Sequence, residues 1–238
     1  MIRPLVTPLM LGVALTTSTI AHAQSLAAWD LSGQPGTQTS NVVTFTAAGI
    51  AGVNLTAGSG LSPNAGANSM NAAGWNDLNV NDYFQFGFTN NTGTVVAVNQ
   101  ILLGTRSSNT GPGLVNVSYS TNGFSTSTLL SQINQSPGSN FVNSVIDAAV
   151  NVAAGGTFLV RLTSANSTAA NGGAVGSTGT FRITNYFSGG TDTGSFRITG
   201  NAITAVPEPG QIAQALAACV VLGGGYYLRR RPAAATAA

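Results

Sequence analysis

Carboxylates supply most of the residues in this sequence that could do chemistry, and they are few. Charged residues make up 6% of the 238-residue chain, Lys is absent, and there is a single His. Asp77 and Asp82 lie close together in an Asn-rich segment whose oxygen atoms suit either a turn or a calcium ion. The segment lacks the regular spacing of an EF-hand loop. We therefore interpret it as a turn and retain Asp77 and Asp82 as the alternative calcium ligands.

The residue types that are missing exclude several classes of enzyme. His22 falls in the segment interpreted below as a signal peptide, so the rest of the chain lacks the imidazole of a Ser-His-Asp triad or a zinc site. The absence of Lys excludes Schiff-base chemistry. Two aspartates would suffice for a glycosidase, but their spacing along the chain selects no pair. The sequence therefore predicts a protein that is not an enzyme and needs no cofactor.

Aromatic side chains suggest a different kind of site. Exposed Trp and Tyr rings offer flat, rigid surfaces that can stack on a sugar ring. The candidates for such stacking are Trp29, Trp75, Tyr83 and Tyr119. The chain is also rich in Ser, Thr and Asn, whose hydroxyl and amide groups hydrogen-bond readily to sugar hydroxyls. A carbohydrate-binding module would have to expose these rings.

The segments that must position these residues alternate apolar and polar side chains with the period of a β-strand. Turn clusters of Gly, Asn and Pro separate them, which is typical of an antiparallel β-sandwich or barrel. We expect Phe84, Phe86 and Phe88 to share one face, and we place Arg161 on the face opposite Leu159. The best internal candidate for a helix is residues 143–152. Strands are expected at residues 27–32, 41–46, 52–56, 83–89, 94–103, 115–120 and 157–163.

A short internal repeat adds two strands, because residues 179–184 recur in similar form at 194–199. Period two puts the Phe and Ile of each copy on one face, and Arg182 and Arg197 on the other. Residues 188–193 would connect the two copies as an antiparallel pair. The two arginines would then either bind acidic sugars or, as we prefer, keep a strand edge solvated.

The two ends of the chain differ from its middle and look like targeting signals. Residues 1–23 have the charge, the apolar run and the small residues of a signal peptide, with signal peptidase expected to cut after Ala21-His22-Ala23, before Gln24. Residues 211–228 carry no charge and, as a helix of about 1.5 Å per residue, would just span a bilayer. Arg229, Arg230 and Arg231 follow and should stay in the cytoplasm. Without the arginines at the two ends, four arginines face six carboxylates, which argues against nucleic-acid binding.

The C-terminal segment resembles the PEP-CTERM sorting signal of Gram-negative and related bacteria. Pro207, Glu208 and Pro209 form the motif, and the apolar helix and the arginine cluster follow in the order of that family. The resemblance covers residues 206–231, and residues 232–238 extend past the usual end as a short tail. It implies that an exosortase recognises the motif and removes the helix. It also implies transient insertion in the inner membrane, then release to the cell surface or an exopolysaccharide matrix.

Several short stretches, among them residues 28–31, 82–86, 105–108 and 119–124, are similar to the jelly-roll-like ectodomains of such proteins and span most of residues 26–203. The ectodomain itself is expected at residues 24–205. The fold class expected is therefore all-β, an antiparallel jelly-roll-like β-sandwich between a signal peptide and a transmembrane helix. The leading hypothesis is an exported structural protein of the cell surface or biofilm matrix, sorted by an exosortase. The alternative is a carbohydrate-binding module of the envelope or matrix, with exopolysaccharide as its partner. A glycan-active enzyme that uses two aspartates is the least favoured.

Overall fold

The computed structural model describes residues 24–138, 140–188, 191–192 and 196–203, and all regular structure in these residues is β-strand. The signal peptide, the Pro207-Glu208-Pro209 motif, the span at 211–228 and the arginine cluster at 229–231 lie outside the described residues. Within the residues described, no helix is long and apolar enough to cross a membrane.

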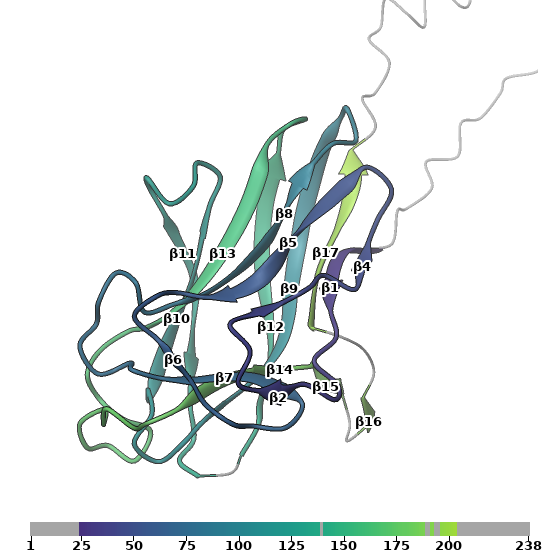
Figure 1. The fold of residues 1–238 in the computed structure, drawn as a ribbon. Helices are drawn as coiled ribbons and strands as arrows, with labels where there is room; N and C mark the ends of the chain where they lie inside the picture. Colours follow the sequence, from purple (N-terminus) through teal and green to yellow (C-terminus); the bar gives the residue numbers. More distant parts are fainter. Residues whose placement is uncertain (1–23, 139, 189–190, 193–195, 204–238) are drawn as a thin grey trace, which may run out of the picture.

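Two mainly antiparallel sheets pack face to face as a β-sandwich, as Figure 1 shows. The six-stranded sheet runs in the order β11 (Thr128–Asn134), β10 (Leu114–Ser120), β13 (Thr157–Ser164), β8 (Phe84–Asn90), β5 (Ile50–Ala57) and β3 (Ser40–Asn41). The nine-stranded sheet runs β2 (Pro35–Gly36), β7 (Ser69–Ala73), β14 (Phe181–Thr184), β9 (Val95–Ser107), β17 (Phe196–Ile203), β1 (Gln24–Trp29) and β4 (Phe45–Thr46). In addition, β12 (Val142–Val152) pairs with β9, and β6 (Ser62–Pro63) pairs with β7. A separate pair joins β15 (Phe187–Ser188) to β16 (Thr191–Asp192).

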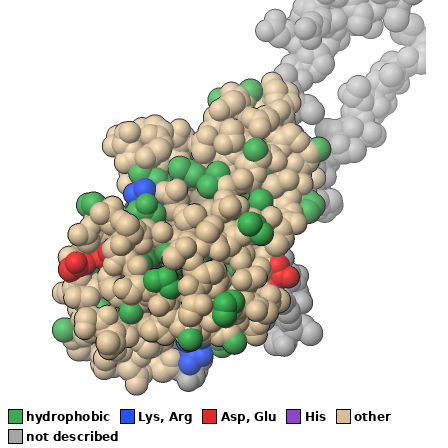
Figure 2. Space-filling model, viewed as in Figure 1, with side chains coloured by type: hydrophobic (Ala, Val, Ile, Leu, Met, Phe, Trp, Pro, Cys, Tyr) green, Lys and Arg blue, Asp and Glu red, His purple; other side chains and the backbone are tan. Residues whose placement is uncertain are grey.

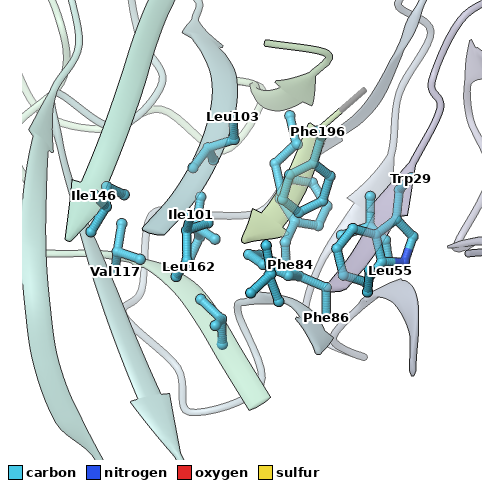
Figure 3. Close-up of a cluster of buried hydrophobic side chains, with 14 of the residues drawn as sticks. Trp29, Leu55, Phe84, Phe86, Ile101, Leu103, Val117, Ile146, Leu162 and Phe196 are labelled. Atoms are coloured by element: carbon cyan, nitrogen blue, oxygen red, sulfur yellow. The ribbon is translucent and has the colours of Figure 1, made fainter. Parts of the chain in front are cut away.

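The core lies between the two sheets and is rich in aromatic rings (Figure 3). Phe84, Phe86 and Phe88 are fully buried, which confirms that they share the inner face of β8. Trp29 reaches from β1 across the sandwich, so that its ring lies 5.3 Å from that of Phe86. The Phe196 ring stacks on Trp29 at 4.7 Å. Each such ring removes 150 Å² or more from water, so this cluster holds the two sheets together.

Residues 143–152 are not a helix, because they belong to strand β12. From Ile146 to Val152 every second side chain is buried, as in a strand with one face on the core. Two features hid the alternation of a strand in the sequence. Val145 is apolar although its side chain is 49% exposed, and a bulge shifts the register between Asp147 and Val150. The sequence analysis also missed β7 and β11, whose side chains do not alternate between polar and apolar.

The repeat forms two strands whose Phe and Ile residues are buried, as expected. However, β14 and β17 do not pair with each other. Both lie antiparallel to β9, where Arg182 is opposite Arg106 and Arg197 is opposite Leu102. The expected connection at 188–193 is therefore wrong, because β9 is long enough to pair with the two copies one after the other.

Candidate functional site

The two tryptophans are not sugar-stacking platforms. Trp29 and Trp75 are fully buried, and their indole Nε1–H groups donate to the backbone oxygens of Val53 at 3.1 Å and Ala72 at 2.8 Å. A ring with both faces in the core offers no surface to a ligand. The expectation that either one stacks on a sugar is wrong, because the same size that suits a platform also fills a sandwich core.

Tyr119 is half-buried and also serves the core. Its ring stacks on that of Phe158 with the centroids 5.5 Å apart. In the register of the six-stranded sheet it lies opposite the buried Val160, so it points inward. Of the four rings considered, Tyr83 alone lies on the outer surface, directly before β8.

Tyr83 and Phe124 hold the guanidinium of Arg161 between them. The Arg161 Cζ lies 3.8 Å from the Tyr83 ring centroid and 4.1 Å from that of Phe124. Arg161 Nε donates a 2.8 Å hydrogen bond to Gln85 Oε1. We call these four residues the Arg161 cluster. Its three anchors fix the guanidinium plane, whereas the terminal Nη groups have no hydrogen-bond partner among the residues described.

Strand register brings the cluster to the outer face of the six-stranded sheet. Arg161 lies between the buried Val160 and Leu162 on β13, and Gln85 is its partner on β8. Leu159 also points outward, so placing Arg161 opposite Leu159 is wrong, since residues two apart in a strand share a face. The row continues through polar side chains, with Ser118 beside Arg161 and Thr56 beside Gln85.

The loop between β10 and β11 presents Phe124 to the arginine. Ser120 Oγ accepts hydrogen bonds from the backbone N–H groups of Asn122 and Phe124, and Asn122 Oδ1 accepts one from Thr126 N–H. Phe124 has a φ of 66°, which is costly for a bulky side chain. The loop therefore accepts backbone strain in order to place an aromatic ring on the surface. Sequence reasoning missed this role, although an isolated Phe after Asn122-Gly123 was a visible signal.

Asp77 and Asp82 come together in the loop before the cluster. Their side chains are hydrogen-bonded, and Asn79 N–H donates to Asp82 Oδ2 at 3.1 Å. Burial, then the hydrogen bond and charge of Asp77, raises the pKa of Asp82 to about 6. The hydrogen bond from Asp82 lowers the pKa of Asp77. Protonation of Asp82 below about pH 6 therefore favours this hydrogen bond between the two carboxyl groups.

Each carboxylate whose side chain the structure describes takes part in a hydrogen bond. Asp30 accepts hydrogen bonds from Asn185 Nδ2 and Ser32 N–H, which lower its pKa, and Asp147 accepts one from Gln100. Asp77 and Asp82 hydrogen-bond to each other and leave no room for a sugar between them. The residues described also contain no group of three or more metal-binding side chains.

Comparison with known proteins gives structural neighbours alone. No family model and no curated protein matches the chain. A mutant of a family 29 carbohydrate-binding module aligns with a TM-score of 0.39 at 9% identity, over 75% of this chain and 92% of that one. A second family 29 module gives 0.38 at 10% identity over 76% and 89%, and a mutant in complex with mannohexaose gives 0.37 at 10% over 76% and 92%. At TM-scores this low no residue of those modules can be mapped onto the chain.

Proposed function

We propose that the chain is a glycan-binding protein of the cell surface or extracellular matrix, and that the Arg161 cluster is its contact site. The single observation that carries this proposal is the guanidinium held between Tyr83 and Phe124, whose Nη groups donate to no described residue. Because the side chain is already fixed, it loses little rotamer entropy when it donates to sugar hydroxyls. The neighbouring Ser118, Gln85 and Thr56 add hydroxyl and amide groups along the same row.

The surface around the cluster suits a neutral polymer better than a charged one. Figure 2 shows charged side chains as a few isolated spots on a face formed largely by other polar side chains and backbone. Such a face binds through many weak hydrogen bonds, and its aromatic groups exclude water at the centre. The proposed action is binding without catalysis, which agrees with the mutual hydrogen bond of Asp77 and Asp82.

The route to the surface is a further part of the proposal. A signal peptide at 1–23 and the PEP-CTERM-like segment at 206–231 would deliver the sandwich across the inner membrane and let an exosortase release it. Intact mass of the protein recovered outside its host cells tests this route. A chain from Gln24 to a residue near Pro209 supports it, and a mass that retains 211–238 contradicts it.

Affinity electrophoresis of the purified protein in gels that contain neutral polysaccharides tests the binding site. Arg161→Gln and Phe124→Ala should each raise the dissociation constant obtained from the retardation about tenfold or more, because each removes a contact group of the Arg161 cluster. Arg197→Gln is the matched control, since Arg197 lies on the other sheet. If all variants are retarded like the wild type, or the wild type binds no neutral polymer, the proposal is wrong.

A further inference from the structure

Two arginines lie side by side on the outer face of the nine-stranded sheet. Arg182 on β14 and Arg106 on β9 are register partners, with Asn71 on β7 completing the row. The residues that flank Arg182 in β14, Phe181 and Ile183, are fully buried, so both arginines point away from the core. Directly opposed residues in such a sheet have Cβ atoms about 5 Å apart.

Nothing among the described residues neutralises these two charges. Arg182 makes no hydrogen bond or ion pair with any described residue, and the one hydrogen bond of Arg106 joins its Nε to Gly138 O at 3.4 Å. Burial first, and then the charge of Arg106, lowers the pKa of Arg182. Like charges directly opposite each other destabilise a sheet. Among the described residues the two arginines are therefore an unfavourable pair, and their four Nη groups donate no hydrogen bond.

The surrounding residues hold the two side chains in place without binding their Nη groups. The Phe141 ring lies 5.3 Å from Arg106 Cζ, which braces that side chain. On the other side Gly66 approaches Arg182 so closely that a Cβ there would lie 3.1 Å from Nη1. Asn71 is 1% exposed and its Oδ1 accepts no hydrogen bond, although Arg182 is its register partner. Asn71 Oδ1 thus receives no hydrogen bond from its arginine neighbour in the sheet.

We propose that Arg106 and Arg182 form a binding site for the anionic group of an acidic polysaccharide, a carboxylate or a sulfate. A guanidinium presents two parallel N–H donors that match the oxygens of either group. Two adjacent guanidiniums would grip one anion and at the same time relieve their mutual repulsion. The site lies on the opposite sheet from the Arg161 cluster and does not depend on it. Two such sites on opposite faces would let one molecule bridge two polymer chains.

The test measures thermal unfolding and binding of the purified full-length protein at low salt. The probes are a polyuronate, dextran sulfate, neutral dextran and duplex DNA. We expect the polyuronate, dextran sulfate or both to raise the Tm by several degrees, and salt at about 200 mM to abolish most of the effect. A response to the polyuronate alone identifies a carboxylate site, and a response to dextran sulfate alone identifies a sulfate site.

Arg106→Gln and Arg182→Gln should each weaken acidic-polymer binding about tenfold, while Arg197→Gln changes it less than twofold. Without polymer, both site variants should melt at the wild-type temperature or higher, because each removes a like-charge contact. A purely structural role would instead lower the Tm. The proposal is overturned if neither acidic polymer binds, if duplex DNA binds equally well, or if the Gln variants bind like the wild type. Loss of neutral-glycan binding in Arg161→Gln would not affect this result.

Discussion

The outer faces of the two sheets carry the same residue type in opposite circumstances. On the six-stranded sheet, Arg161 lies between two aromatic rings and gives its Nε to Gln85. On the nine-stranded sheet, Arg182 faces another arginine and makes no hydrogen bond with a described residue. The first guanidinium is a fixed donor whose charge interacts with two π-systems, whereas no described residue compensates the charge of the second. On this difference rests our proposal that hydroxyl-rich ligands bind one face and anionic ligands the other.

The largest predicted effect is on the free energy of unfolding, which should depend strongly on the rings of the core and little on those of the Arg161 cluster. Phe86→Ala should lower the free energy of unfolding by about 3–5 kcal/mol, because it leaves a cavity between Trp29 and Phe196. Phe124→Ala should change it by less than about 1 kcal/mol, because it removes a surface contact with Arg161 and leaves no cavity in the core. Urea denaturation measures both. Equal destabilisation would mean that Phe124 is structural.

Reversing one charge of the arginine pair should sharpen the contrast between the sheets. Arg182→Glu places a carboxylate opposite Arg106 and should stabilise the protein by about 0.5–1 kcal/mol while it abolishes anion binding. Thermal melts at low salt and at 0.5 M salt measure the gain, which screening should reduce. Arg161→Glu is the matched change on the other face and should destabilise, since it loses both ring contacts. If Arg161→Glu stabilised the protein instead, the proposed difference between the two arginine environments would be wrong.

The two faces should also differ in their response to pH. The folded-state pKa of Asp82, about 6, lies above its usual value of 3.8, so the stability that its protonated form contributes is present below pH 3.8 and lost as pH rises through 6. The lowered pKa of Asp77 acts in the opposite sense, below pH 3.8. The free energy of unfolding should therefore be about 1 kcal/mol larger at pH 5 than at pH 7.5.

Asp82→Asn should remove this dependence, because its amide can donate to Asp77 at every pH. Urea titrations at several pH values from 4.5 to 8 measure it. The loop leads directly into Tyr83, so neutral-glycan binding should follow the same curve and anion binding should not. A wild type with equal stability at pH 5 and pH 7.5 would contradict this account of the carboxyl pair.

The smallest predicted effect is on acidic-polymer affinity and concerns Gly66, which lies beside the Arg182 guanidinium. Gly66→Ala should displace the guanidinium by a few tenths of an ångström, because its Cβ would lie 3.1 Å from Nη1. We expect a two- to fivefold loss of acidic-polymer affinity and a slightly lower Tm, because the same Cβ would lie 3.0 Å from Ser69 Oγ. Gly93→Ala is a poor control because of its φ of 77°. Gly173→Ala is a better one, since the nearest atom to its added Cβ would be Asn171 Oδ1 at 3.2 Å. An equal loss of affinity in Gly66→Ala and Gly173→Ala would show that Gly66 has no specific role at the site.

Period-two patterning predicted the sandwich and most strands of its middle, because core strands must alternate their side chains. It failed at β12, where an exposed Val145 and a bulge imitate helical spacing. It also gave the correct faces to Arg182 and Arg197 but the wrong neighbours, because strand order depends on contacts between distant segments. The Arg161 cluster joins residues 83, 85, 124 and 161, and no local pattern could have connected them.

The central claim is that sugars contact the Arg161 cluster, and side-chain NMR tests it most directly. Titration of the ¹⁵N-labelled protein with a neutral oligosaccharide should shift the Arg161 Nε–H signal and the ring protons of Tyr83 and Phe124. The Arg197 Nε–H signal should stay in place. Shifts confined to the Arg106 and Arg182 signals, or no shift at any arginine at saturating binding, would contradict the claim.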